Sequence, residues 1–194
     1  MLHDIRIDGS LYRLRPVTDG DAALILELRS DPELNRFLHA TSGMIVDQLG
    51  WLAKYYQREG DYYFAIERRS DGNSEGFVAL YDIDWSTKTG EWGRWILRPG
   101  SLAAVESAYL IYSVAFDRLG LESVYCRTVA GNVKVVSFHD SCGIANRKVL
   151  PGHFELSGGW HDAVEHCVDC AFWMELRPRL ASLVGSAAKR INRA

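Results

Sequence analysis

The clearest change of pattern in the chain is a seven-residue alternation followed at once by a helical period. Residues 91–97 alternate as a β-strand does, which places successive side chains on opposite faces. The two predicted faces are Glu91, Gly93, Trp95 and Leu97 on one side and Trp92, Arg94 and Ile96 on the other. Pro99-Gly100 then ends the strand. From Leu102 the apolar residues recur at helical spacing, which predicts a helix to about Arg118.

The remaining segments predict one mixed α/β domain. The other predicted strands are Tyr12–Val17, Asp61–Arg68, Gly76–Asp84, Ser123–Val129, His153–Leu156 and Ala163–Trp173. The other predicted helices are Ala22–Arg29, Pro32–Leu38, Asp47–Arg58 and Asn132–Ser141. The strands from 61 to 97 predict an antiparallel meander. The strand at 91, the helix at 102 and the strand at 123 predict a βαβ unit with parallel strands. We therefore expect a single mixed sheet of six or seven strands flanked by helices over residues 1–177, followed by a C-terminal helix or tail over 178–194.

A strand that turns sharply into a helix is a candidate anion site. The turn leaves backbone N–H groups unpaired at the positive end of the helix dipole, where phosphate or pyrophosphate binds well. A carboxylate, Glu91, stands at the upstream end of the same strand. A phosphate cradle and a potential base on one strand are the main chemical signal in the sequence.

Composition narrows the classes of function. The formal net charge is −3, which gives no electrostatic support for nucleic-acid binding. No apolar run reaches the roughly 18–20 residues of a membrane span, and the N-terminus lacks a signal-peptide pattern. We therefore expect a cytoplasmic protein with reduced cysteines. Cys167-Val-Asp-Cys170 is a lone CxxC in a segment that alternates like a strand, so we expect no metal.

Three motifs resemble the GNAT superfamily of acetyl-CoA-dependent N-acetyltransferases. Arg13-Leu-Arg-Pro-Val-Thr-Asp-Gly-Asp-Ala resembles the family's first strand and helix, and Glu27-Leu-Arg-Ser-Asp-Pro-Glu-Leu resembles its LRxDPE helix end. Asn132-Val-Lys-Val-Val-Ser-Phe-His-Asp-Ser-Cys-Gly-Ile144 resembles its N-x-x-A-x-x-L-Y-E-K-x-G-F helix in spacing. Within the superfamily the chain is most similar to the branch of ribosomal-protein N-terminal and nucleotide-amino-sugar acetyltransferases.

The resemblance implies direct attack of an amine on the thioester of acetyl-CoA, which is a co-substrate. It implies Glu91 as general base and His139, at the usual tyrosine position, as general acid in its imidazolium form. For Glu91 the alternative is an ion pair with a basic residue on a neighbouring strand. We do not expect Arg94 to be that partner, because strand parity would point the two side chains apart. Asn132 is a coenzyme ligand by the resemblance, a helix N-cap by its position, or both.

The implied coenzyme-binding residues follow the strand and the turn. They are Trp95, Ile96, Leu97, Arg98, Gly100, Ser101, Leu102, Ala103, Ala104, Val105, Asn132 and Ser137. The family's glycine-rich loop is replaced here by Leu102-Ala-Ala-Val105, so Arg98 or a nearby basic residue would supply charge.

The acceptor is the least specified part of the sequence. The resemblance places its site near Asn35–Met44, Tyr81–Trp85 and Phe154–Trp160. We expect a small-molecule primary amine, with an amino sugar on a nucleotide carrier as one candidate. A protein N-terminal acetyltransferase and a non-catalytic acyl-CoA-binding module are the alternatives. For the tail after Arg177, packing in a homodimer and fraying are both open.

Overall fold

The structure is a computed structural model that describes residues 2–156 and 158–191. Its strands form one eight-stranded sheet in the order β1-β2-β3-β4-β5-β6-β8-β7. The strands are β1 Ile7–Asp8, β2 Tyr12–Pro16, β3 Tyr62–Arg68, β4 Ser74–Asp84, β5 Thr89–Leu97, β6 Ser123–Val129, β7 Arg147–Leu156 and β8 Gly159–Asp169. The helices are α1 Ala22–Ser30, α2 Pro32–Asn35, α3 Ile45–Tyr55, α4 Ala104–Ser113, α5 Val133–Cys142 and α6 Cys170–Ile191. A short 3₁₀ turn, Asp19–Asp21, precedes α1, and a π turn, Val114–Arg118, extends α4.

The predicted topology is confirmed, with one strand more than the expected upper number. The β3-β4-β5 meander is antiparallel, and β5 runs parallel to β6 through the α4 crossover. The strand β1 is an addition, because its two residues are too short to give a periodic signal. The strand β8 lies between β6 and β7.

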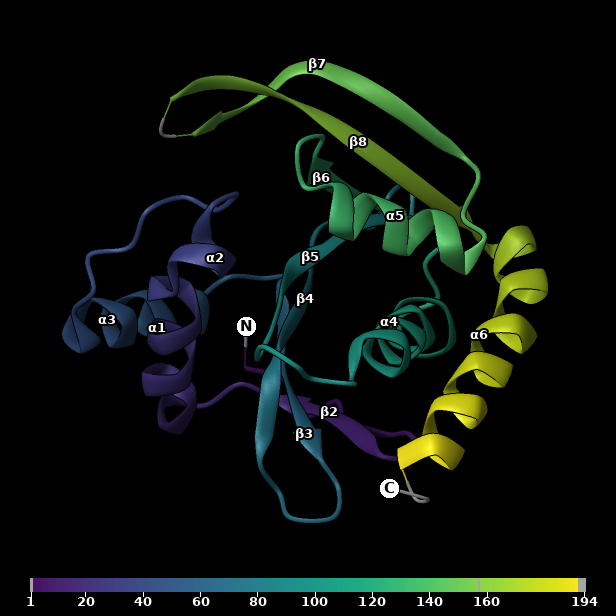
Figure 1. The fold of residues 1–194 in the computed structure, drawn as a ribbon, viewed down its shortest axis with the longest axis horizontal. Helices are drawn as coiled ribbons and strands as arrows, with labels where there is room; N and C mark the ends of the chain where they lie inside the picture. Colours follow the sequence, from purple (N-terminus) through teal and green to yellow (C-terminus); the bar gives the residue numbers. More distant parts are fainter. Residues whose placement is uncertain (1, 157, 192–194) are drawn as a thin grey trace.

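Helices cover both faces of the sheet (Figure 1). One face packs against α1 and α3 through a core that includes Ile25, Leu52, Tyr63 and Phe77. The other face packs against α4 and α6 through a core that includes Trp92 and Tyr112. The two cores are separate because the sheet lies between them, and we call these sides the α1/α3 face and the α4/α6 face.

A β-bulge in β5 overturns the predicted alternation. Phe77 pairs with Ile96 while Ala79 pairs with Gly93, so β5 has one residue more than β4 over this interval. Arg94 accommodates it with a left-handed φ of 47°. As a result, Trp95 packs with the α4/α6 core, as Trp92 does. Arg94 is turned to the α1/α3 face, where its guanidinium contacts Tyr81 and Trp51.

The C-terminal third differs from the prediction in its boundaries. The strand β7 begins at Arg147 rather than His153, and β8 ends at Asp169, so Trp173 belongs to α6 rather than to a strand. The helix α6 runs through Pro178 and through Gly185, and the expected boundary between residues 177 and 178 lies inside it. Leu180 and Val184 are buried, so this helix is part of the packed core. In Figure 1 it lies along the outer side of α4.

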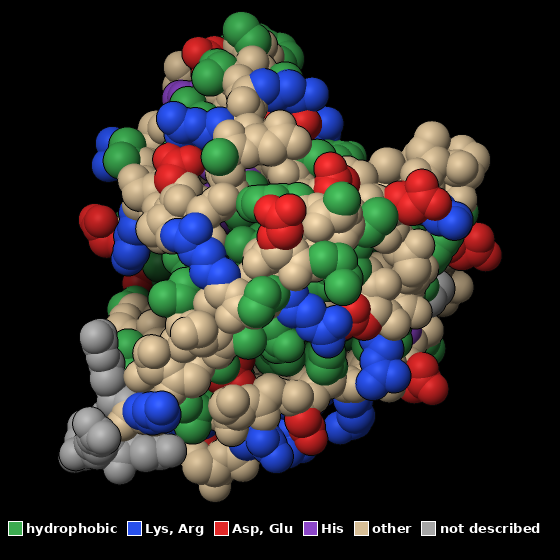
Figure 2. Space-filling model, turned by 90° about the vertical axis from the view of Figure 1, so that its right-hand side faces the viewer, with side chains coloured by type: hydrophobic (Ala, Val, Ile, Leu, Met, Phe, Trp, Pro, Cys, Tyr) green, Lys and Arg blue, Asp and Glu red, His purple; other side chains and the backbone are tan. Residues whose placement is uncertain are grey.

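The surface around α6 mixes both charge signs. Lysine and arginine side chains are interspersed with aspartate and glutamate on the face that Figure 2 shows. None of the helices within residues 2–156 and 158–191 is both long enough and apolar enough for a membrane span. Within the same residues, no group of three His, Cys, Asp or Glu side chains is arranged to hold a metal ion.

Candidate active site

The sheet opens between its two parallel strands. The ladder between β5 and β6 comprises only the pairs Thr89–Ser123, Gly90–Val124 and Glu91–Tyr125. Both strands then continue, to Leu97 and Val129, without pairing to one another. The gap therefore begins where Glu91 stands, and the backbone groups that line it have no partner strand there. On the α4/α6 face, the ring of Trp95 lies 4.9 Å from that of Phe138 in α5.

Glu91 is buried at the closed end of this gap. Its residue is 7% exposed. The Tyr81 hydroxyl donates a hydrogen bond to its Oε1 at 3.1 Å, and Nη1 of Arg127 lies 3.2 Å from its Oε2. Burial raises the pKa of Glu91, and Arg127 and Tyr81 oppose that rise without cancelling it. A carboxylate with a raised pKa in a partly closed site suits a general base.

The expected alternative for Glu91, an ion pair across to a neighbouring strand, is therefore present. The partner is Arg127 of β6. The reason given for excluding Arg94 was wrong, because the bulge places Arg94 and Glu91 on the same face. Arg94 instead makes a bidentate ion pair with Asp61 at 2.6 and 2.9 Å. Its guanidinium also lies 4.4 Å from the Tyr81 ring centroid.

The segment that the sequence predicts as a phosphate cradle is a tight turn followed by the start of α4. Ser101 N–H donates to the Arg98 carbonyl at 3.1 Å, and Gly100 has a φ of 79°. A proline followed by a positive-φ glycine is a type II turn. The helix begins at Ala104 rather than Leu102, which is 61% exposed. Within the described chain, the N–H groups of 104–106 donate to no other group, so the first turn of α4 is available to an anion.

Two side chains modify this cradle. Nη1 of Arg98 lies 3.0 Å from Glu27, so its charge is shared with a carboxylate. Glu106, in the first turn of α4, is buried and accepts a hydrogen bond from the Leu11 N–H at 3.0 Å. Glu106 already stabilises the positive end of the helix. Its carboxylate contacts the β1–β2 turn, a contact between distant segments that no local sequence pattern indicates.

Gly100→Ala is expected to lower the free energy of unfolding by about 1 kcal/mol. No atom lies within 4 Å of a Cβ at this position, so the cost comes from the left-handed backbone alone. Chemical denaturation of both proteins measures it. Gly50→Ala is the matched control: Gly50 is exposed inside α3, with equal space around it. We expect that change to raise stability by about 0.5–1 kcal/mol. Equal effects of the two changes would contradict a backbone origin.

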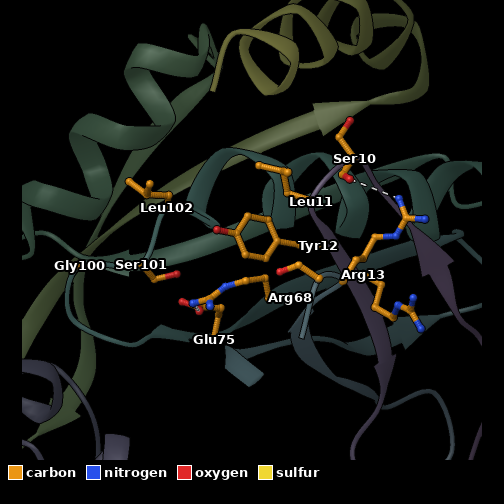
Figure 3. A pocket seen from close by; sticks show the side chains of 11 residues that line it. Ser10, Leu11, Tyr12, Arg13, Arg68, Glu75, Gly100, Ser101 and Leu102 are labelled. Carbon is orange, nitrogen blue, oxygen red and sulfur yellow. Dashed lines mark hydrogen bonds and ion pairs between the residues drawn. The ribbon is translucent and has the colours of Figure 1, made fainter. Parts of the chain in front are cut away.

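A cavity of about 590 Å³ lies beside the cradle. Gly100, Ser101 and Leu102 form one wall, and the ends of β2 and β3 form the other. Figure 3 shows the Tyr12 ring and Arg68 between these walls, with Arg68 paired to Glu75. The cavity is distant from Glu91, because Leu97, near the cradle, is six residues along the strand, or about 20 Å. It therefore adjoins the predicted phosphate end of the site and not the predicted base.

His139 is buried on the α4/α6 face, and its environment does not suit an imidazolium acid. The residue is 2% exposed and its Nε2 lies 3.5 Å from Cys126 Sγ. Its ring is 5.3 Å from Trp92 and 4.9 Å from His166. Burial, with the neighbouring His166, lowers the pKa of His139 to about 3. The imidazole is therefore neutral at pH 7, and the charged form that we expected there is not favoured.

The two remaining predicted ligands lie on α5. Asn132 is its N-cap, and the side-chain oxygen accepts from the Val135 N–H at 3.4 Å. Ser137 is exposed on the helix surface. Of the strand residues, Trp95 faces α5, whereas Ile96 packs into the α1/α3 core with Phe77. The Ile96 side chain therefore lies on the far side of the sheet from the cradle helix.

The comparison with known families decides the classification. A model of the acetyltransferase (GNAT) domain matches residues 12–145. This chain belongs to that family. Members of the family generally take an acetyl group from acetyl-CoA. The opened strands, the Trp95 and Phe138 surface and the free N–H groups of α4 fit an extended molecule with a phosphate end.

Solved structures agree with this assignment. Apo FdhC, described as a nucleotide-linked sugar GNAT, is 30% identical over 92% of this chain and 98% of that chain, with a TM-score of 0.76. A GCN5-related N-acetyltransferase from Brucella melitensis has a TM-score of 0.81 at 19% identity, covering 94% of this chain and 86% of its own. A mutant of the spermidine N-acetyltransferase SpeG from Vibrio cholerae has a TM-score of 0.74 at 19% identity, covering 86% and 98%. The last two show the fold alone. A sequence search of curated proteins gives no match.

Sequence reasoning missed Arg127 and Glu165. Tyr125 and Arg127 alternate with the buried Val124 and Cys126, so parity alone indicates that β6 has a polar face. It does not indicate which strand faces Arg127. That depends on β8 lying between β6 and β7, an order that the sequence pattern does not contain.

Proposed function

We propose that the protein transfers an acetyl group from acetyl-CoA to the primary amine of a small molecule. The observation that carries the proposal is Glu91, buried with a raised pKa where the two parallel strands separate. When bound, acetyl-CoA supplies the activated acetyl thioester. The residues of this chain that would hold it are the N–H groups at the start of α4, Trp95 and Asn132.

In the proposed reaction, Glu91 takes one proton from the acceptor before the attack, because an ammonium ion has no lone pair. The neutral amine then forms the N–C bond, the C–S bond breaks, and the departing CoA thiolate is balanced by the second proton that the nitrogen loses. Glu91 faces the α1/α3 side of the sheet, with Tyr81 and Arg127. The cradle belongs to a helix on the other side. The amine therefore approaches from the α1/α3 face.

The charges on that face favour an amino sugar on a nucleotide carrier over a polyamine. Asp61, Glu91 and Glu165 each form an ion pair with an arginine or a lysine. The further ammonium groups of a polyamine would therefore meet compensated carboxylates along this row. Lys148 is 65% exposed and is open to a phosphate. The 30% identity to a nucleotide-linked sugar GNAT supports the same class.

Titration of the purified protein with acetyl-CoA, followed by assays of thiol release, tests the proposal. We expect acetyl-CoA to bind, and thiol to be released with nucleotide-linked amino sugars but not with spermidine or N-terminal peptides. The matched control is the same sugar nucleotide already N-acetylated, which has no nucleophile and should release no thiol. Absence of acetyl-CoA binding would contradict the activity. Release with peptides only would assign the protein to N-terminal acetylation instead.

A further inference from the structure

We propose that Arg127 is a positioning residue that holds Glu91 in its proton-accepting form, and that Glu165 limits the share of the arginine's charge that Glu91 receives. The inference rests on the proposed function, because it concerns the same carboxylate. It assigns roles to two residues outside the motifs that define the family resemblance in this sequence. It also connects the base to strands β7 and β8.

The sheet itself builds the connection. Lys148 pairs in register with Glu165, and Glu165 pairs in register with Arg127, so the three side chains lie in a row across β7, β8 and β6. Glu91 and Tyr81 are likewise direct partners across β5 and β4. The parallel ladder brings Arg127 diagonally opposite Glu91, two residues beyond its partner Tyr125. The result is an alternating row of charges on the α1/α3 face.

Arg127 is shared unequally between two carboxylates. Its Nε lies 2.8 Å from Glu165, whereas its Nη1 lies 3.2 Å from Glu91. The guanidinium also lies over the Tyr125 ring, 4.4 Å from the centroid, in a cation–π contact. Lys148 holds the other oxygen of Glu165 at 2.9 Å. Glu165 therefore orients the arginine, and the distances show that Glu91 receives the weaker of its two contacts.

The other groups near Glu91 do not duplicate this role. From β4, Tyr81 donates to Oε1, and Asp82 adds a negative charge that favours the protonated form. Tyr125 lies on β6 beside the arginine. On β5 itself, Arg94 is held in a bidentate pair by Asp61. Arg127 is thus the cation in direct contact with Glu91 among the residues that the structure describes.

Two substitutions should move the proton affinity of Glu91 in opposite directions. Arg127→Gln removes the nearby positive charge and should raise that affinity by at least about tenfold. Glu165→Gln removes a nearby negative charge and leaves Arg127 with Glu91 as its one carboxylate partner, so the affinity should fall. NMR titration of the Glu91 carboxyl carbon, assigned by its loss in Glu91→Gln, measures both without any substrate.

Two control variants separate this role from general damage. Arg127→Lys keeps the charge and should shift the titration less than Arg127→Gln does. Lys88→Gln breaks the exposed Lys88–Glu122 pair and should shift nothing. Shifts of the same sign in Arg127→Gln and Glu165→Gln, or no shift, would overturn the proposal. If the two variants shift the Glu91 titration in opposite directions but leave the pH profile of kcat/KM unchanged, Arg127 and Glu165 do control the charge of Glu91. Glu91 is then not the general base.

Discussion

Glu91→Gln is expected to lower kcat/KM for acetyl transfer by about 10²–10⁴-fold, the usual contribution of a positioned general base. The amide keeps the size of the side chain and still accepts a hydrogen bond from the Tyr81 hydroxyl, but it takes no proton. Steady-state thiol release measures the change. The amide nitrogen then replaces the oxygen that faces Arg127, which keeps Glu165 as its carboxylate partner. The fold should therefore persist, and thermal unfolding of the variant checks this.

The pH dependence supplies a second readout of the same substitution. Burial raises the pKa of Glu91, and only the deprotonated form can act as a base. In the wild-type protein kcat/KM should therefore rise as the pH increases through that raised pKa. This rising limb of the pH profile should lie at higher pH than an exposed glutamate would give. The limb should disappear in Glu91→Gln. A limb that remains in the variant would assign it to another group and contradict the role of Glu91.

Trp92→Ala is expected to lower the free energy of unfolding by about 3–5 kcal/mol, the range for removing a large aromatic side chain from a core. Trp92 is 1% exposed, and its Nε1–H donates to the Tyr112 hydroxyl at 3.0 Å. The change leaves a cavity beside α4 and a buried hydroxyl that loses one partner. Urea denaturation, with the slope checked for two-state behaviour, measures the loss.

Trp85→Ala is the matched control, because it removes the same side chain from the surface. Trp85 is 51% exposed, in the turn between β4 and β5, and its removal should change stability by less than about 1 kcal/mol. Similar losses in the two variants would contradict the distinction between core and surface. A small loss of unfolding free energy in Trp92→Ala would show that the α4/α6 core repacks to fill the cavity left by the indole.

The sequence pattern predicted the middle of the fold better than its ends. The meander, the parallel crossover and α4 follow from strong periodicity and from Pro99-Gly100. The bulge at Arg94 was invisible, because one additional residue in a strand leaves no signature in side-chain type. The C-terminal boundaries failed because the alternation of β8 continues directly into α6 at Cys170. Propensity could not separate the two elements there.

The candidate site was predicted in part for a similar reason. Glu91 and the cradle are local features of one strand and one turn, and a sequence window contains both. Beside the cradle, Glu106 and Leu11 form a hydrogen bond although they are 95 positions apart in the sequence. The partners of Glu91 likewise come from other strands, β4 and β6. The protonation state of His139 depends on burial against Trp92 and His166, which the helical period did not reveal.

The short ladder between β5 and β6 also has a mechanical consequence. It divides the sheet into a blade of five strands and a blade of three, joined by a seam of three residue pairs. Hydrogen bonds stiffen each blade but contribute little across the seam. The angle between the blades is therefore set mainly by side-chain packing of the helices that bridge them. A ligand that spanned the gap would connect the two blades and restrict their relative motion.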